Sequence, residues 1–273
     1  PQLGEDTEPF VQIAQFLNAH GFVAPDILAQ DPSNGLLLLG DLGAMDFVKW
    51  LRQSPEDEKR LYLSAADVLL RLEDVGPPQD LKRMTPAVGA DMVAIVGAYY
   101  SNTSTDDLCA AMQDALASFA PDPTVLALRD YHAENLIWRD AHQGLDRVGL
   151  LDFQDAFVAP AGYDLVSLLR DARRDVGENT ADDMITYFSE QIGAGPAFRT
   201  QLACIAIQRN LRILGIFGRL SLKYGKARYL DLIPRVWGHI LTDLEDPAIA
   251  KLRQAVLDTV PEPTDALLAG LRP

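Results

Sequence analysis

The chain has 273 residues, 48% hydrophobic and 23% charged, which is an ordinary composition for a folded globular protein. Its formal net charge of −15 argues against nucleic acid or an anionic membrane as the main partner, because the phosphates of both would repel an acidic surface. The sequence contains no apolar run long enough to predict a transmembrane helix. The charge permits a cationic or metal-bound substrate, although an acidic surface also simply keeps a protein in solution.

Apolar periodicity predicts a mixed amino-terminal part followed by a mainly helical remainder. The first part is expected to form a helix, a short strand, a turn, a buried strand and a glycine-bounded break, over residues 9–20, 25–29, 31–35, 36–39 and 40–43. Three further short strands are expected at 125–128, 136–138 and 148–151. Helices are expected at 55–74, 86–100, 106–119, 164–174, 181–192, 197–221, 227–242 and 246–258.

The two cysteines, Cys109 and Cys204, both lie in segments with a helical apolar pattern. Buried thiols are therefore expected in place of a disulfide, which suits a reducing compartment.

Two polar clusters directly follow predicted strands. The sequence RDYHAEN (129–135) comes after the strand at 125–128, and DFQD (152–155) comes after the strand at 148–151. A polar residue just past a buried strand is held rigidly at the edge of a cleft. These clusters are therefore the candidate functional site.

Asp130, Asn135 and Asp152 have the residue types and the spacing that phosphoryl transfer needs. Such a transfer depends on positioning and charge neutralisation more than on covalent chemistry. A carboxylate accepts the proton of the attacking hydroxyl, and oxygen ligands hold Mg²⁺ against the phosphates of ATP. Asp130 is thus the predicted base, and Asn135 and Asp152 are the predicted magnesium ligands. Each alone could be an ordinary turn or strand-end residue, so the combination favours the functional interpretation.

These residues carry a resemblance to a known family. LRDYHAEN and LLDFQDA, followed by AGYDLVSLL, resemble the aminoglycoside phosphotransferase and choline kinase-like family over residues 125–170, and LLLLGDLG resembles the last strand and hinge of its nucleotide lobe. The stretches QRNLRILGIFGRL and KARYLDLIPRVW resemble in particular the bacterial anomeric kinases of N-acetylmuramate and N-acetylglucosamine. The resemblance implies a two-lobed, protein kinase-like α+β fold, ATP and Mg²⁺ as cofactors, and a cell-wall amino sugar of peptidoglycan recycling as substrate.

Two residues are expected to structure the catalytic loop. His132 should hydrogen-bond within the loop and orient it. Asp164 has the position of a helix N-cap, and the resemblance implies that it also braces the loop. The resemblance further implies that the backbone of Gly40 and Leu42 bonds adenine.

The weaker candidates for substrate contact are Glu134, Asp155 and Arg209. Arg209 and Arg212 lie on a largely apolar predicted helix, with Arg219 further along it. Salt bridges to the abundant acidic residues are their expected role, and a contact with a sugar carboxylate is the alternative.

Two features depart from the family pattern. Leu128 stands where the family has a histidine of mainly scaffold function. The family also places a phosphate loop and a strand lysine before a helix such as 9–20, and no such unit precedes Pro1. We therefore expect the chain to be part of a longer protein, in which Glu5, Asp6 or Glu8 would pair with that lysine. A degenerate kinase that binds without catalysing is the alternative.

The sequence thus predicts residues 1–42 as the remainder of an incomplete nucleotide-binding lobe and 43–273 as a mostly helical lobe that carries the catalytic loops. The expected protein is a cytoplasmic, ATP-dependent small-molecule kinase. Aminoglycoside, choline or homoserine are alternative acceptors, and a non-catalytic nucleotide-binding protein is an alternative of another class. A metal-dependent hydrolase that uses Asp130, His132, Glu134 and Asp152 is disfavoured, because paired-histidine motifs are missing from the sequence.

Overall fold

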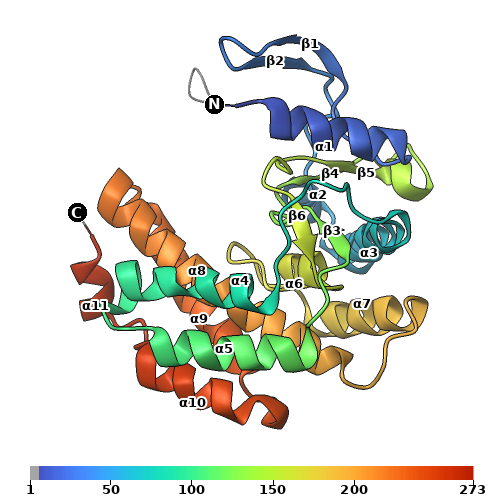
Figure 1. Ribbon diagram of the computed structural model, residues 1–273. Coiled ribbons are helices and arrows are strands. Elements are labelled where there is room, and N and C mark those ends of the chain that lie inside the picture. The colour runs from blue at the N-terminus through green and yellow to red at the C-terminus, as the bar shows by residue number, and fades with distance from the viewer. Residues whose placement is uncertain (1–5, 273) are drawn as a thin grey trace.

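The computed structural model describes residues 6–272 and is built mainly of helices, with three small antiparallel two-stranded sheets (Figure 1). Strand β1 pairs with β2, β3 with β6, and β4 with β5. This arrangement confirms the predicted α+β class. The strands are β1 Ile27–Asp31, β2 Leu36–Leu39, β3 Val125–Ala127, β4 Leu136–Trp138, β5 Val148–Leu150 and β6 Phe157–Ala159.

The helices occupy most of the predicted positions. Helix α5 and strands β2 and β4 have the predicted bounds, and the other predicted helices are found with shifted or interrupted bounds. Strand β6 and helices α2 and α11 have no counterpart among the predicted elements. The helices are α1 Glu8–Ala19, α2 Phe47–Gln53, α3 Glu58–Val75, α4 Pro86–Asp91, α5 Asp106–Phe119, α6 Tyr163–Leu169, α7 Glu178–Gln191, α8 Phe198–Tyr224, α9 Ile233–Asp243, α10 Ala250–Thr259 and α11 Asp265–Gly270.

Helix α1 and the β1–β2 hairpin form one end of the molecule, and α5, α8, α9 and α10 form the other (Figure 1). The β4–β5 hairpin joins the first end to the rest, because the Leu150 amide donates to the Val23 carbonyl (2.8 Å) and the Trp138 amide to the Met45 carbonyl (2.7 Å). A boundary between lobes at residue 42 stays a prediction. Of the acidic residues predicted to pair with a lysine, Glu5 lies outside the described residues.

The prediction that 36–39 is a buried strand is wrong in its burial. Leu36 and Leu38 are 49% and 60% exposed, and Leu28 on the partner strand is 62% exposed. Successive side chains of a strand point to opposite faces, and only one face of this hairpin is partly covered within the described residues. A run of four leucines therefore does not by itself predict that both faces of a strand are buried.

Helix α8 is the centre of the helical part and packs against α5, α6 and α9. Two of its glycines allow a close crossing, because a Cβ at Gly215 would lie 2.6 Å from the Ile95 carbonyl carbon, and one at Gly218 would lie 2.1 Å from the Tyr99 carbonyl oxygen. The predicted helix 86–100 is not continuous on the other side of this crossing. After α4 it passes through a 3₁₀ turn and a π-helical turn, so tertiary packing overrides its helical pattern.

Helix α6 ends at Leu169, five residues before the predicted end at residue 174. The buried carboxylate of Asp171 accepts a hydrogen bond from the backbone amide of Arg173 (2.9 Å). A hydrogen bond from a backbone amide to the side chain of an aspartate two residues earlier favours a turn over a continued helix.

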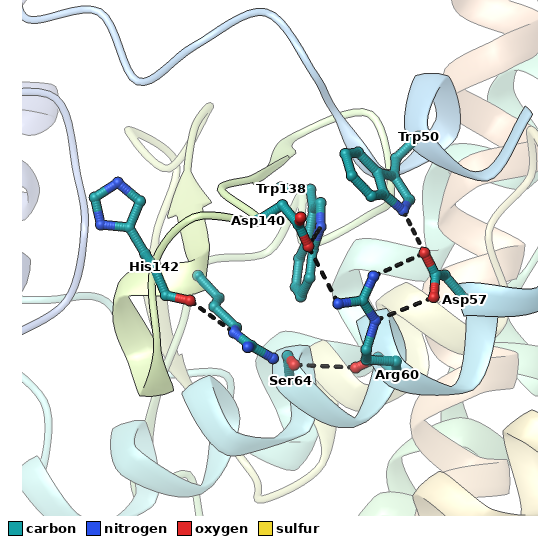
Figure 2. A network of polar contacts seen from close by, with 8 residues as sticks. Trp50, Asp57, Arg60, Ser64, Trp138, Asp140 and His142 are labelled. Atoms are coloured by element: carbon teal, nitrogen blue, oxygen red, sulfur yellow. Dashed lines mark hydrogen bonds and ion pairs between the residues drawn. The ribbon is translucent and has the colours of Figure 1, made fainter. Parts of the chain in front are cut away.

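An aromatic and charged cluster fixes strand β4 against α2 and α3 (Figure 2). Arg60 donates to Asp57 (2.7 Å) and to Asp140 (3.1 Å), and its guanidinium lies 5.1 Å from the centre of the Trp138 ring. The indoles of Trp50 and Trp138 donate to Asp57 (2.8 Å) and Asp140 (3.2 Å), respectively. Because β4 begins directly after Asn135, this cluster also holds one end of the predicted catalytic loop.

Neither cysteine is in a disulfide: Cys204 is buried and Cys109 is partly buried. No helix in the described part of the chain is long and apolar enough to cross a membrane.

Candidate active site

The predicted base and the two predicted metal ligands lie together at the ends of β3 and β5. The side-chain amide of Asn135 donates to the Asp130 carbonyl (2.9 Å) and to the Asp152 carboxylate (3.3 Å). The Leu151 amide donates to the Asn135 carbonyl (3.0 Å), which ties the two loops together. The sequence separates these residues, and the antiparallel β4–β5 hairpin between them returns the chain to the same place.

Two residues of the site have a backbone conformation that non-glycine residues rarely adopt. Arg129, directly before Asp130, has φ 75°, and Asp152 has φ 60°. A left-handed conformation costs about 1 kcal/mol or more for such residues and persists only where surrounding contacts impose it. Each turn projects an acidic residue at the end of a strand.

Helix α6 supplies the contacts that impose the conformation at Arg129. The buried carboxylate of Asp164 accepts hydrogen bonds from the amides of Leu128 (2.5 Å) and Arg129 (2.9 Å), and the Ser167 hydroxyl donates to the Arg129 carbonyl (3.1 Å). The prediction that Asp164 is an N-cap is wrong, since Gly162 precedes the helix and the Asp164 side chain faces the loop. Burial raises the pKa of Asp164 to about 7, against the opposing effect of its two amide donors.

The Asp130 carboxylate accepts no hydrogen bond from the described residues, and burial raises its pKa. Arg209 opposes this rise, and the nearby Asp152 carboxylate adds to it. A carboxylate whose proton affinity is raised, and which is free to accept a bond, has the properties of a general base.

His132 lies beside Asn135, with its Nε2 3.2 Å from the Asn135 side-chain nitrogen. Burial, with Arg173 and Arg209 nearby, lowers the pKa of the ring to about 3, so the ring is neutral near pH 7. Nε2 of a neutral ring can share one of the two hydrogens of the Asn135 amide, which also serve the Asp130 carbonyl and the Asp152 carboxylate, and this contact is internal to the loop.

Asp130, His132 and Asp152 line a cavity of about 320 Å³ between the loops and helix α8. Five arginines also line it: Arg129, Arg173, Arg209, Arg212 and Arg219. The prediction that Arg209 and Arg212 form salt bridges is wrong, since neither they nor Arg219 have an acidic partner within 4.0 Å among residues 6–272. The reason is geometric, because they project from α8 into the cavity and away from the acidic surface.

A family model described as the phosphotransferase enzyme family matches residues 1–199. An N-acetylmuramate/N-acetylglucosamine kinase of Caulobacter vibrioides is 38% identical over 267 residues, which cover 90% of this chain and 73% of that kinase. The chain belongs to the phosphotransferase enzyme family. A kinase of the same name from Pseudomonas aeruginosa is 31% identical, with 97% of this chain and 82% of that kinase covered.

Solved structures of the phosphotransferase fold agree with this assignment. A choline/ethanolamine kinase family protein of Mesorhizobium loti superposes with a TM-score of 0.65 at 15% identity, over 92% of this chain and 83% of that one. Spectinomycin phosphotransferase, in its AMP-bound complex, gives a TM-score of 0.63 at 16% identity over 93% and 85%. The fold is thus the kinase-like fold predicted from the sequence, and the protein is a small-molecule kinase.

The other candidate residues of the phosphotransferase lie around the centre. Asp155 is exposed, lines the same cavity and lies 3.6 Å from Arg129. Glu134 is exposed and pairs with Arg173 (3.0 Å), and it does not line this cavity. The position of Asp155 in the cavity therefore keeps it as a candidate for substrate contact. Glu134 touches the cavity only indirectly, through its ion pair with the cavity residue Arg173.

The hinge candidates Gly40 and Leu42 lie outside the cavity that contains Asp130. Leu42 lines a separate cavity of about 420 Å³ together with Trp138, and Gly40 does not line it. The Gly40 amide already donates to the Asp26 carbonyl (2.8 Å), so only its carbonyl oxygen could bond an adenine.

The arrangement of Asn135 and Asp152 fits a magnesium ion. Within the described residues, no cluster of three or more His, Cys, Asp or Glu side chains could hold a metal alone. Magnesium at a phosphoryl-transfer site takes only one or two protein side chains and completes its shell with phosphates and water. The Asp152 carboxylate is exposed, and the Asn135 side chain points its amide group inward, which leaves its oxygen to face a ligand.

Sequence reasoning missed Ser167 and Arg129. The sequence around Ser167 does not indicate a contact with the catalytic loop, because a serine in an amphipathic helix can have many roles. Arg129 could have been noticed as the residue before the base, but its left-handed backbone has no sequence signature.

Proposed function

We propose that this phosphotransferase moves the γ-phosphate of ATP to the anomeric hydroxyl of N-acetylmuramate or N-acetylglucosamine. The observation that carries the proposal is the free carboxylate of Asp130 in a cavity beside the joined pair of Asn135 and Asp152. The acceptor comes from the names of the relatives, which are 38% and 31% identical over most of this chain. Such a reaction serves the recycling of cell-wall sugars, and its need for ATP supports a cytoplasmic location.

Asp130 acts as the base in the proposed reaction. The sugar oxygen forms a bond to the γ-phosphorus while the bond between that phosphorus and the β–γ bridging oxygen breaks, and ADP leaves. The hydroxyl proton passes to the Asp130 carboxylate, whose raised pKa makes it a better acceptor than an exposed aspartate. Asp164 and Ser167 hold the backbone before Asp130, so the carboxylate keeps its direction.

Asn135 and Asp152 would hold magnesium, and His132 keeps Asn135 in place from the other side. When bound, Mg²⁺ neutralises charge on the nucleotide phosphates. The Gly40 carbonyl and the Leu42 backbone would bond adenine. The AMP bound to spectinomycin phosphotransferase, which shares this fold, supports the use of a nucleotide.

The lining of the cavity disfavours a cationic acceptor. Five arginines line it against three aspartates, Asp130, Asp152 and Asp155, so an aminoglycoside or choline would meet repulsion. The proposed base and the proposed metal ligands also lie together, which favours turnover over nucleotide binding alone.

The test is a coupled assay of ADP release by the purified full-length protein with Mg·ATP and each amino sugar, with the sugar 1-phosphate identified by ³¹P NMR. Asp130→Asn should lower turnover by about 10²- to 10⁴-fold while thermal unfolding stays unchanged. The exposed Asp122→Asn is the control and should retain wild-type turnover. Sugar-independent ADP release, or full activity of Asp130→Asn, would contradict the proposed function.

A further inference from the structure

Three arginines of helix α8 form a row along one side of the cavity. Arg209, Arg212 and Arg219 are three and seven residues apart in turn, a spacing that keeps them on one face of a helix. Ten residues of helix span about 15 Å, so the arginine row (Arg209, Arg212, Arg219) is much longer than a phosphoryl group. It follows the cavity away from the catalytic loops.

No carboxylate of the described residues forms an ion pair with the arginine row, although Arg209 and Arg212 lie near enough to Asp130 to lower the pKa of its carboxyl. Arg209 is only 5% exposed, yet its Nε and Nη1 have no hydrogen-bond partner, and the same holds for the buried Nε of Arg219. The other arginines of the cavity are engaged, since Arg129 lies 3.6 Å from Asp155 and Arg173 lies 3.0 Å from Glu134. A buried cation without a partner is costly, so its retention at a cavity wall points to an anionic ligand.

Buried arginines elsewhere in this protein do have partners. Arg170 binds both carboxylate oxygens of the buried Asp243, and Arg174 donates to Glu58 (2.7 Å) and to the Tyr62 hydroxyl (2.6 Å). The fold therefore pairs its structural arginines. The unpaired donors of Arg209 and Arg219 differ from that pattern, and both residues line the cavity that contains Asp130.

The position of the row distinguishes an acceptor anion from the transferred phosphate. Arg209 and Arg212 are close enough to Asp130 to lower the pKa of its carboxyl, whereas Arg219 is not among the groups that do so. The proposed phosphate site is at Asn135 and Asp152, which lie on the loops and not on helix α8. An anionic group bound by the arginine row is therefore expected to be part of the acceptor, the molecule whose hydroxyl faces Asp130.

We propose that Arg209 and Arg212 form a carboxylate subsite that makes the enzyme prefer an acidic amino sugar over its neutral counterpart. The inference rests on the proposed function and deepens it, because N-acetylmuramate carries a carboxylate and N-acetylglucosamine does not. A guanidinium binds a carboxylate through two parallel hydrogen bonds, and both are strong where water is excluded. The apolar side chains of Ile213 and Ile216, which line the same wall, would contact the sugar and its lactyl methyl group.

The experiment compares three acceptors that differ in charge: N-acetylmuramate, its methyl ester and N-acetylglucosamine. Arg209→Gln and Arg212→Gln are each assayed for kcat and KM with all three. Arg199→Gln is the matched control, because Arg199 lies on the same helix, is exposed and pairs with the exposed Asp182. Unfolding curves accompany each variant, and removal of an unpaired charge should leave stability unchanged or raise it.

The wild type should favour N-acetylmuramate over its ester by about 10- to 100-fold in kcat/KM, which is the effect of one or two charge-assisted hydrogen bonds. Each glutamine variant should lose this preference through a higher KM for N-acetylmuramate, so that kcat/KM falls more with N-acetylmuramate than with its ester or with N-acetylglucosamine. An equal loss with all three acceptors would assign the arginines to the transferred phosphate, and an unchanged preference would leave them without a role. Either result overturns the subsite, whereas inactivity of the wild type with all three sugars overturns the proposed function and the subsite with it.

Discussion

Glu73, in helix α3, should make this protein less stable as the pH rises. Burial raises the pKa of its carboxyl from 4.5 to about 7, with the nearby Asp164 adding to the rise and the Gly162 amide opposing it. In the unfolded chain the group titrates near 4.5, so the folded state binds more protons between these two values. Stability that is present below pH 4.5 is therefore lost as the pH rises to about 7.

The size of this effect follows from the shift. A change from 4.5 to about 7 is about 2.5 pKa units, and at about 1.4 kcal/mol per unit the total loss is a little over ~3 kcal/mol at pH 8. Most of that loss falls between pH 5 and pH 8. Glu73→Gln has the same shape, stays neutral and can still accept the bond from the Gly162 amide. It should therefore be about 2–3 kcal/mol more stable than the wild type at pH 8, with a much smaller difference at pH 5.

Urea unfolding of both proteins at pH 5, 6, 7 and 8 measures the difference directly. The exposed Glu190→Gln is the control and should follow the wild type at every pH. A difference between Glu73→Gln and the wild type that does not change with pH would refute the reasoning, as would a variant that is less stable at pH 8.

Two further predictions concern packing and the catalytic loop. Gly218→Ala should lower the free energy of unfolding by about 2 kcal/mol or more, because the added Cβ would lie 2.1 Å from the Tyr99 carbonyl oxygen. Gly238→Ala in α9 is the control and should be neutral or stabilising, because its Cβ would meet nothing within 4 Å. Equal urea midpoints for the two variants would contradict the close crossing of α8. Ser167→Ala removes the donor to the Arg129 carbonyl and should cost about 1 kcal/mol together with a several-fold lower kcat. The partly exposed Ser189→Ala in α7 is the control and should leave kcat unchanged. A normal kcat with Ser167→Ala would show that the bond does not position Asp130.

The site could be predicted from the sequence because its parts are local. Asp130 and Asn135 are five residues apart on one loop, and Asp152 follows a strand that pairs with the strand after Asn135. A short antiparallel hairpin is enough to bring them together, so spacing and residue type carry most of the information. Asp164 was found only through a family resemblance, and its sequence position suggested an N-cap that the helix does not use.

Three of the failed predictions concern long-range packing. The pattern at 86–100 is helical, but the backbone of α8 approaches it through Gly215 and Gly218 and a regular helix is not kept. The apolar run of β2 predicts buried leucines, but the burial of each leucine depends on what covers its face of the hairpin. The charges of Arg209 and Arg212 suggested salt bridges, and only the direction in which α8 faces shows that they line a cavity.

The contact between Phe10 and Phe153 links helix α1 to the candidate active site. The two rings stack with centroids 4.7 Å apart, and Phe153 is the residue after Asp152. A displacement of helix α1 would therefore act on Phe153 and on the adjacent Asp152, the residue proposed to hold magnesium. The direction of that carboxylate is coupled in this way to helix α1, so Phe10→Leu is expected to change the magnesium dependence of turnover before it changes the KM for the sugar.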